Sequence, residues 1–250
     1  MFEPAPSPQV IAIYRARNAE RLSRVLTAGA SGSRPWGLWA LDEVAPSLAA
    51  WTVGQGPGGK FDLLNKILHL MPSTDHLPLV VTDDDIDLRR GTLTGLCALM
   101  ATAGLDLAQP AHARRSQSSY EFNRRRRGSR ARLTTFVEIG PVFAMAPAWR
   151  AAFAPFPADL GMGWGLELLW ARQREHGCRL GVVDAVTVHH PDYPTLGYAQ
   201  EVEEARAQTL MQEAGVSTMR EAQQVLGTWW PWQPQPSWLG DDPRERRWTE

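Results

Sequence analysis

Four aspartates follow a short apolar segment in the first half of the chain. They are Asp83, Asp84, Asp85 and Asp87, and they come directly after the run 79–81. An apolar, β-branched run of this length is typical of a buried central strand. Carboxylates so close together repel one another unless a cation lies among them, and Mg²⁺ or Mn²⁺ takes oxygen ligands from carboxylates and substrate phosphates. Because ligands of open α/β sheets bind beyond the carboxyl ends of the strands, the segment predicts a divalent-metal site. The alternative is a solvated acidic turn in which Asp87 caps the next helix.

A glycine-rich turn that ends in a lysine comes before the acidic segment. The turn spans residues 54–60 and leads into a predicted helix over 61–70. It lacks the Gly-Lys-Ser/Thr ending of a Walker sequence. Glycines still allow close approach of the backbone, and a helix N-terminus offers N–H groups to a phosphate. Lys60 could therefore neutralise a diphosphate, although a flexible loop with a solvated lysine would have the same sequence.

A second set of glycines flanks a tryptophan in the segment 159–167. Such a tight loop could present the indole face of Trp164 to a sugar ring or a base. Glu167 stands early in a predicted helix and could act as a general base for an acceptor hydroxyl. The alternative is a glutamate that the helix dipole favours at a helix start.

Two histidines end the apolar segment 181–188, which has the composition of a buried strand. Successive side chains of a strand point to opposite faces, so only one of His189 and His190 can point into a given site. A neutral imidazole beside the aspartates would complete a carboxylate and imidazole site of the Mn²⁺ type. A strand end at the protein surface is the alternative.

Strand and helix patterns alternate along the rest of the chain and predict one α/β domain with a mixed sheet. We expect strands over 10–14, 36–41, 49–53, 105–109, 136–145 and 180–190. We expect helices over 18–28, 91–104, 164–176, 201–214 and 218–226. A basic loop is expected over 120–132. The predicted organisation is a single domain over 1–228 and a Trp- and Pro-rich tail over 229–250.

Composition narrows the class of protein. The 250 residues are 44% hydrophobic, enough for a sizeable core, and the formal net charge of -1 argues against bulk attraction to nucleic acid. No stretch approaches the ~20 apolar residues of a membrane span, and the N-terminus has no signal-peptide pattern. We therefore expect a cytoplasmic protein. Cys97 and Cys178 are too few for a disulfide framework or a structural zinc site.

The order of these features resembles a GT-A glycosyltransferase, the nucleotide-diphospho-sugar transferase fold with a mixed, mainly parallel central sheet flanked by helices. The segment 163–167 is similar to the loop that carries the acceptor-binding tryptophan and the catalytic carboxylate of inverting galactosyltransferases, although Leu168 stands where those enzymes have a second acid. A closer resemblance, over about 59–197, is to the domain of unknown function seven-oh-seven family, whose members are named by their likeness to glycosyltransferases. That family usually has Asp where this chain has Glu167. The matching segments are 59–60, 82–85, 109–111, 136–138, 141–143, 148–150, 164–166, 181–184, 189 and 194–197.

The resemblance implies a role for each candidate residue. Asp85 would be the main ligand of Mn²⁺ or Mg²⁺, together with Asp83 and with His189, the histidine at the family position. Trp164 and Gly165 would bind the acceptor, and Glu167 would take its proton. The donor nucleotide would be bound by Tyr14, Arg15, Arg17, Lys60, Asp83 and Asp84. The implied function is a metal-dependent transfer of a sugar from a nucleotide-sugar donor to a saccharide or glycolipid-type acceptor, with inversion of the anomeric centre.

Two segments leave other functions open. The arginines within 114–132 could hold the phosphates of an acceptor or a lipid, or could form a solvated loop. The tail tryptophans could pack on the domain or touch a membrane surface peripherally, and the prolines among them favour packing. They are Trp229, Trp230, Trp232 and Trp238. A non-catalytic polyanion-binding protein and a metal-dependent nucleotidyltransferase are therefore the alternatives to a glycosyltransferase, whose partners would not include nucleic acid.

Overall fold

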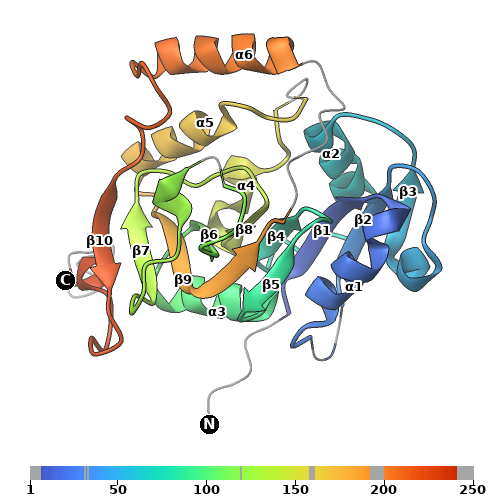
Figure 1. Ribbon diagram of the computed structural model, residues 1–250, viewed down its shortest axis with the longest axis horizontal. Coiled ribbons are helices and arrows are strands. Elements are labelled where there is room, and N and C mark those ends of the chain that lie inside the picture. The colour runs from blue at the N-terminus through green and yellow to red at the C-terminus, as the bar shows by residue number, and fades with distance from the viewer. Residues whose placement is uncertain are drawn as a thin grey trace.

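The chain folds around one mixed sheet that helices cover on both faces (Figure 1). The computed structural model describes residues 7–30, 32, 34–118, 120–157, 161–191 and 200–240. The strands are β1 (Gln9–Tyr14), β2 (Trp36–Ala40), β3 (Thr52–Gln55), β4 (Leu79–Thr82), β5 (Asp87–Arg90), β6 (Leu107–His112), β7 (Ala131–Thr134), β8 (Val142–Met145), β9 (Leu180–His189) and β10 (Val225–Trp229). The helices are α1 (Ala19–Thr27), α2 (Lys60–Leu70), α3 (Leu93–Thr102), α4 (Arg150–Phe153), α5 (Leu166–Arg172) and α6 (Gln200–Glu213). The mixed α/β fold expected from the sequence is confirmed.

The directions of four strands bring their carboxyl ends to one edge of the sheet. In the described residues the strand order is β10-β7-β9-β6-β8-β4-β1-β2-β3, and β5 pairs with β9 off this path. The strands β3, β2, β1 and β4 are parallel, and β8 is antiparallel to both β4 and β6. β6 therefore points the same way as β4, and β9 is parallel to β6. The ends of β1, β4, β6 and β9 consequently meet at the edge where ligands of α/β sheets bind.

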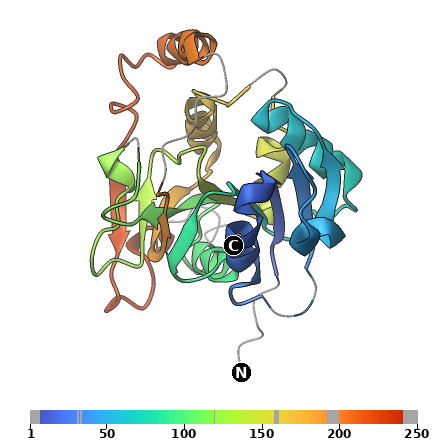
Figure 2. The same cartoon turned by 45° about the vertical axis from the view of Figure 1, so that its right-hand side comes forward.

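Two apolar clusters fill the two faces of the sheet. One face packs on α1 and α3 through side chains such as Leu22 and Leu96. The other face packs on α2, α4 and α5 through Phe61, Phe153 and Trp170. α6 lies outside α5, as both ribbon views show (Figure 2). All four residues of β4 are buried, so the acidic segment after this strand starts from a rigid base. None of the helices in the described ranges combines the length and the apolar composition that crossing a membrane requires.

Several segments differ from the expectation. The helix expected over 218–226 is wrong, because its last residues begin β10 and the N–H of Gln224 donates to the hydroxyl of Thr135 beside β7 at 2.8 Å. A local amphipathic pattern carries no information on this long-range pairing. The strand expected over 49–53 is displaced to β3, since Pro46 starts a 3-10 turn that runs to Trp51. β8 is the strand within 136–145, and β5 and β7 are strands that the sequence analysis did not predict.

Two tryptophans of the segment 229–250 lie in the core. Trp229 ends β10, and the indole N–H of Trp238 donates to the carbonyl of Ala103 at 2.8 Å. Both tryptophans are buried. The rings of Trp230 and Trp232 stack with their centroids 5.1 Å apart, and Trp232 is 75% exposed. The division into a domain and a tail stays a prediction, and residues 241–250 lie outside the described residues.

Candidate active site

Two aspartates that follow β4 have charged partners from other elements. Asp83 forms an ion pair with Lys60, whose Nζ lies 2.6 Å from Oδ1. Oδ1 of Asp85 lies 3.1 Å from Nε2 of His190, the residue after β9. Burial raises the pKa of Asp85, but the hydrogen bond and charge of His190 outweigh burial, so the pKa is below its usual range. The structure thus brings the acidic segment, the lysine of the glycine-rich turn and one histidine together.

Asp84 turns inward from the same segment. Its side chain is buried, and its carboxylate accepts a hydrogen bond from the N–H of Arg15 at 2.6 Å. Burial raises the pKa of Asp84 to about 6, although this hydrogen bond and one with Asn18 lower it. Asp84 therefore joins the end of β4 to the end of β1. Its predicted contact with a nucleotide stays a prediction.

The two histidines at the end of β9 have different partners. Nδ1 of His189 lies 4.0 Å from Oδ2 of Asp87 and 3.3 Å from a guanidinium nitrogen of Arg89. His190 is the histidine beside Asp85, and although burial lowers the pKa of His190, Asp85 raises it to a value above 6.5. Of the two histidines, His190 is thus the one in contact with Asp85, and the predicted place of His189 in the metal set stays a prediction. The physical reason for the different partners is β5, which pairs with β9 and turns His189 toward Asp87.

Glu167 is buried in the first turn of α5. Its Oε2 accepts a hydrogen bond from the N–H of Gly165 at 3.1 Å. Burial raises the pKa of Glu167 to about 7, although the nearby backbone N–H groups of Glu167, Gly165 and Ile139 lower it. A carboxylate has about four lone-pair sites, so the bond from Gly165 leaves room for a further proton donor. Residues 158–160 before this loop lie outside the described residues.

The glycines of the loop before Glu167 serve packing as well as turning. Gly163 and Gly165 have φ of 85° and 92°, which side chains rarely adopt. A Cβ at Gly163 would lie 2.1 Å from the ring of Phe61 in α2, and one at Gly165 would lie 2.7 Å from Leu210 in α6. The loop is therefore wedged between two helices. Trp164, between the glycines, stays partly exposed, and its predicted acceptor contact stays a prediction.

Three residues at the end of β1, which are expected to bind the nucleotide, differ in their exposure and contacts. Tyr14 is fully buried, and its hydroxyl bonds to the hydroxyl of Thr52 at 2.9 Å and accepts from the N–H of Ala45 at 3.2 Å. The ring of Tyr14 thus belongs to the core, and its predicted contact with a nucleotide stays a prediction. Arg15 contributes its backbone N–H to the acidic segment, and Arg17 is exposed.

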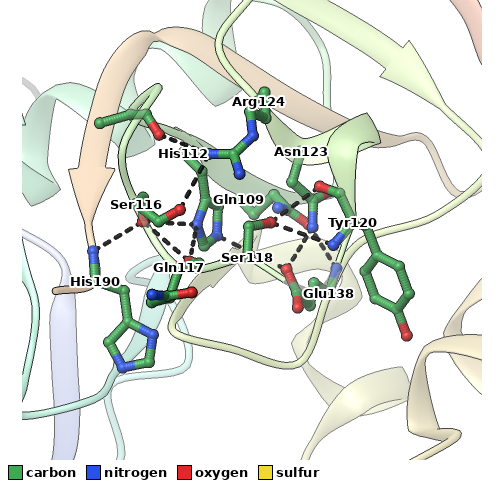
Figure 3. A network of polar contacts seen from close by, with 11 residues as sticks. Gln109, His112, Ser116, Gln117, Ser118, Tyr120, Asn123, Arg124, Glu138 and His190 are labelled. Carbon is green, nitrogen blue, oxygen red and sulfur yellow. Dashed lines mark hydrogen bonds and ion pairs between the residues drawn. The ribbon is translucent and has the colours of Figure 1, made fainter. Parts of the chain in front are cut away.

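Glu138 is a buried acid that the sequence analysis did not select. Its carboxylate lies 3.7 Å from Nε2 of His112, the last residue of β6, and accepts a hydrogen bond from Asn123 (Figure 3). Burial, and next the charge of Glu167, raises the pKa of Glu138 to about 8. It lies between β7 and β8, within the strand expected over 136–145, and its only signal in the sequence was a place in the family-like segment 136–138.

The arginine-rich segment is largely bound to the protein itself. Arg132 is 4% exposed and donates to both carboxylate oxygens of the fully buried Asp184, at 2.9 and 3.1 Å. Arg124 donates to three backbone carbonyls. Arg126 and Arg130 lie over tryptophan rings at the end of β10, 5.0 and 4.9 Å from the ring centroids. The solvated-loop alternative is therefore wrong for Arg124, Arg130 and Arg132, whereas Arg126 is exposed beside the ring of Trp230.

The donor atoms at the site fit a divalent cation that arrives with a phosphate. Among the described residues, no three or more His, Cys, Asp or Glu side chains are grouped as a ready-made metal site. Asp85 and His190 offer one carboxylate and one imidazole in contact. Mn²⁺ and Mg²⁺ commonly bind through one or two carboxylates and complete their shells with substrate phosphates and water. The fit is thus to a shared site of protein and substrate.

A cavity of about 490 Å³ lies away from these groups. Asn65, Met71, Asp75 and Arg150 are among the residues that line it. The guanidinium of Arg150 is already bound to the carbonyl of Thr74 at 3.0 Å and paired with Asp75 at 3.6 Å. Because none of the site carboxylates lines this cavity, we do not place the chemistry there.

A known protein family matches more than half of the chain. Residues 74–228 match the family described as protein of unknown function (DUF707), which is more than half of the chain. The chain belongs to this family. The family predicted from the ordered segments is therefore confirmed. No curated protein matches the sequence.

Solved structures with a similar fold are GT-A glycosyltransferases. GalNAc-T7 with UDP, GalNAc and Mn²⁺ has a TM-score of 0.57 at 10% identity, over 82% of this chain and 48% of its own. The mannosyltransferase PcManGT from Pyrobaculum calidifontis, in complex with GDP-Man and Mn²⁺, has a TM-score of 0.56 at 16% identity, over 85% and 65%. TarS 1–349 of S. aureus with UDP-GlcNAc has a TM-score of 0.52 at 11% identity, over 82% and 64%. The chain thus spans between 48% and 65% of these proteins, and the likeness confirms the predicted GT-A fold alone.

Proposed function

We propose that the protein transfers a sugar from a nucleotide-diphosphate donor to an acceptor hydroxyl, with the help of a divalent cation. The observation that carries the proposal is the meeting of Lys60, Asp85, His190 and Glu167 at one edge of a GT-A sheet. The charge of Lys60 acts on the pKa of each of the other three groups, so the four lie within one electrostatic environment. The nucleotides and nucleotide sugars bound to the solved proteins of similar fold support this class of donor.

The donor diphosphate would lie against Lys60 and the Asp85–His190 pair. Lys60 begins α2, where the helix dipole also favours negative charge. The backbone approaches closely here, since a Cβ at Gly140 would lie 3.5 Å from Nζ of Lys60 and 3.2 Å from Oδ2 of Asp83. Asp85 and His190 would hold the cation, which when bound stabilises the negative charge that develops on the leaving diphosphate.

Glu167 would take the proton of the acceptor. The acceptor oxygen forms a bond to the anomeric carbon while the bond from that carbon to the phosphate oxygen breaks, and the nucleoside diphosphate leaves with the electron pair. The hydroxyl proton passes to Glu167, whose pKa of about 7 keeps part of the group ionised and basic at neutral pH. Trp164 would stack on the acceptor sugar. A single displacement of this kind inverts the anomeric centre.

A thermal-shift screen tests the donor class. Nucleoside diphosphates, nucleotide sugars and nucleoside triphosphates are each added with and without Mn²⁺, because a ligand that binds the folded state must raise its melting temperature. We expect the shift to need both a diphosphate compound and Mn²⁺. Consumption of a triphosphate without any binding of nucleotide sugars would instead support a nucleotidyltransferase, and salt-sensitive binding of polyanions alone would support a binding protein.

Two aspartate variants test the metal ligand within that screen. Asp85→Ala should abolish the Mn²⁺-dependent shift, because Asp85 is the carboxylate in contact with His190. Asp87→Ala is the matched control, since it removes the same charge two residues further along, where Asp87 pairs with Arg21 and Arg89. Equal shifts for Asp85→Ala and the wild type would contradict the metal site.

A further inference from the structure

Glu138 lies in a polar network that is almost closed to solvent (Figure 3). Its own N–H donates to Oε1 of Gln109 at 2.5 Å, and its carboxylate accepts from Asn123 and faces His112. Gln109, His112 and Asn123 are each at most 2% exposed. A buried carboxylate in such a place costs free energy unless it is paired with a cation or protonated. In the described chain, neither Lys nor Arg forms an ion pair with Glu138.

The hydrogen bonds of His112 decide which of its nitrogens carries the proton. Nδ1 lies 3.1 Å from the carbonyl oxygen of Gln117, which can only accept, so Nδ1 is the protonated nitrogen. Burial lowers the pKa of His112 to about 4, so the ring is neutral at pH 7 and Nε2 carries a lone pair. Within the described part of the chain, Nε2 has no hydrogen-bond partner although it is buried. The group that faces this lone pair, at 3.7 Å, is the carboxyl of Glu138.

The segment that Glu138 anchors also holds Glu167. Ile139 directly follows Glu138, and its backbone N–H is close enough to the carboxylate of Glu167 to lower the pKa of that group. We propose that Glu138 is the positioning residue of the base: its carboxyl is a neutral acid aimed at Nε2 of His112, to which it donates a hydrogen bond once the 3.7 Å separation of the two atoms narrows, and this contact keeps Ile139 beside Glu167. The proposal rests on the function of Glu167 proposed above.

The charges that face Glu138 favour the neutral acid. Glu167 from α5 and Asp83 after β4 disfavour a second negative charge, and Lys60 from α2 favours one but is already paired with Asp83 at 2.6 Å. Neutral His112 from β6 adds no charge, and burial is the largest effect, so the pKa of Glu138 is about 8. A neutral Glu138 thus satisfies the lone pair of His112 and adds no negative charge beside the base.

The pH dependence of turnover separates positioning from a merely structural role. In the wild type, turnover under saturating donor should fall about 5-fold from pH 7 to pH 9, because the protonated fraction of Glu138 falls about 10-fold while the ionised fraction of Glu167 about doubles. Glu138→Gln cannot ionise, and its amide N–H can still donate to His112. We expect this variant to transfer somewhat more slowly than the wild type at pH 7 and to lose the fall at alkaline pH. Glu138→Ala should lower turnover at every pH, with little change in donor affinity.

An alkaline fall that is identical in the wild type and Glu138→Gln would overturn the proposal. So would a Glu138→Gln variant as slow as Glu138→Ala at every pH, because an ionised Glu138 would then be required. Melting temperatures measured at each pH identify any variant that is unfolded.

Nitrogen NMR of histidine-labelled protein tests the pair without any substrate. The Nε2 resonance of His112 should be that of a neutral ring that accepts a hydrogen bond, and it should move near pH 8 in the wild type but not in Glu138→Gln. In Glu138→Ala it should have the position of an unbonded lone pair at every pH. A wild-type resonance that does not titrate, or a ring protonated on both nitrogens, would overturn the proposal. If no donor binds to the wild type, the proposed transfer fails, whereas this measurement still decides the Glu138–His112 bond.

Discussion

Two regions of the protein are rich in ionisable side chains. They differ in whether a buried carboxyl group is paired with a cationic side chain. Around Asp184, the carboxylate is fully buried and receives two guanidinium N–H groups of Arg132 and the backbone N–H of Arg126. Around Glu138 and Glu167, two carboxyl groups are largely removed from water, with Glu167 4% exposed and the side chain of Glu138 12% exposed. Among the described residues, however, no arginine or lysine side chain forms an ion pair with either of them.

The difference shows which charged residues are structural. Where every charge is matched, as at Asp184, the ionised form is the stable one and the pair holds β7 and β9 in place. Where acids are buried without a cation, the pKa values rise to about 8 for Glu138 and about 7 for Glu167. Acids with pKa values near neutrality are suited to proton transfer, and they cluster at functional sites. The conspicuous arginine run is therefore mainly a structural feature, and the two glutamates are the acids whose pKa values suit the roles proposed for them.

Breaking the matched region, in which the carboxylate of Asp184 is paired with the guanidinium of Arg132, should have the largest effect on stability. Asp184→Ala leaves the guanidinium of Arg132 buried without its counter-ion, which typically destabilises a protein by about 3–5 kcal/mol. Urea unfolding followed by circular dichroism measures this change. Glu121→Gln is the control, because Glu121 is 85% exposed in its pair with Arg124, and exposed pairs are worth ~1 kcal/mol or less. A loss for Asp184→Ala as small as that of the control would mean that the arginine segment does not hold the sheet.

A substitution in the unmatched region, which contains Glu138 and Glu167, should reduce turnover without reducing stability. Glu167→Gln keeps the size of the side chain but cannot take the acceptor proton, so transfer should slow at least ~100-fold once a donor and acceptor are known. Donor affinity should change little, because the base acts in the transition state. Single-turnover assays and calorimetry measure the two quantities. Turnover near that of the wild type would leave Glu167 as a packing residue of α5 and would favour a transfer mechanism without an enzymic base.

The sequence predicts the parts of the site that depend on one element each, and it misses those that depend on pairing between distant strands. The apolar run before Asp83 and the glycines before Glu167 are local signals, and the acidic segment after β4 lies at the predicted edge of the sheet. The choice between His189 and His190 depends on β5, whose polar composition conceals a strand that pairs with β9. Tyr14 resembles a strand-end ligand in sequence, yet Thr52 and Ala45 hold its hydroxyl in the core.

Two histidine variants test which of the adjacent residues at the end of β9, His189 or His190, supports binding of the metal. His190→Ala should weaken Mn²⁺-dependent nucleotide binding by at least ~10-fold, as the loss of residues that support metal sites commonly does. His189→Ala should leave the affinity within the error of calorimetry, because His189 lies beside Asp87 and Arg89. If His189→Ala is the variant that loses affinity, the side chains of this strand end rearrange on binding and the assignment made from the sequence is right.

The smallest expected effect is a change in how stability depends on pH. The pKa of Glu138 is about 8 in the folded protein, compared with an ordinary value of 4.5, so between these two values the folded state binds more protons than the unfolded state. Stability must therefore decrease as the pH rises through this window, and Glu167 adds to the decrease up to about pH 7. Glu138→Gln cannot lose a proton, so its melting temperature should fall less than that of the wild type between pH 5 and pH 9. A difference of ~1 kcal/mol corresponds to about 2–4 °C for a chain of this size. Glu121→Gln, which replaces an exposed glutamate, should follow the wild type throughout. Parallel curves for the wild type and Glu138→Gln would mean that Glu138 is ionised in the folded protein, and the contrast between a matched and an unmatched region would then be lost at this residue.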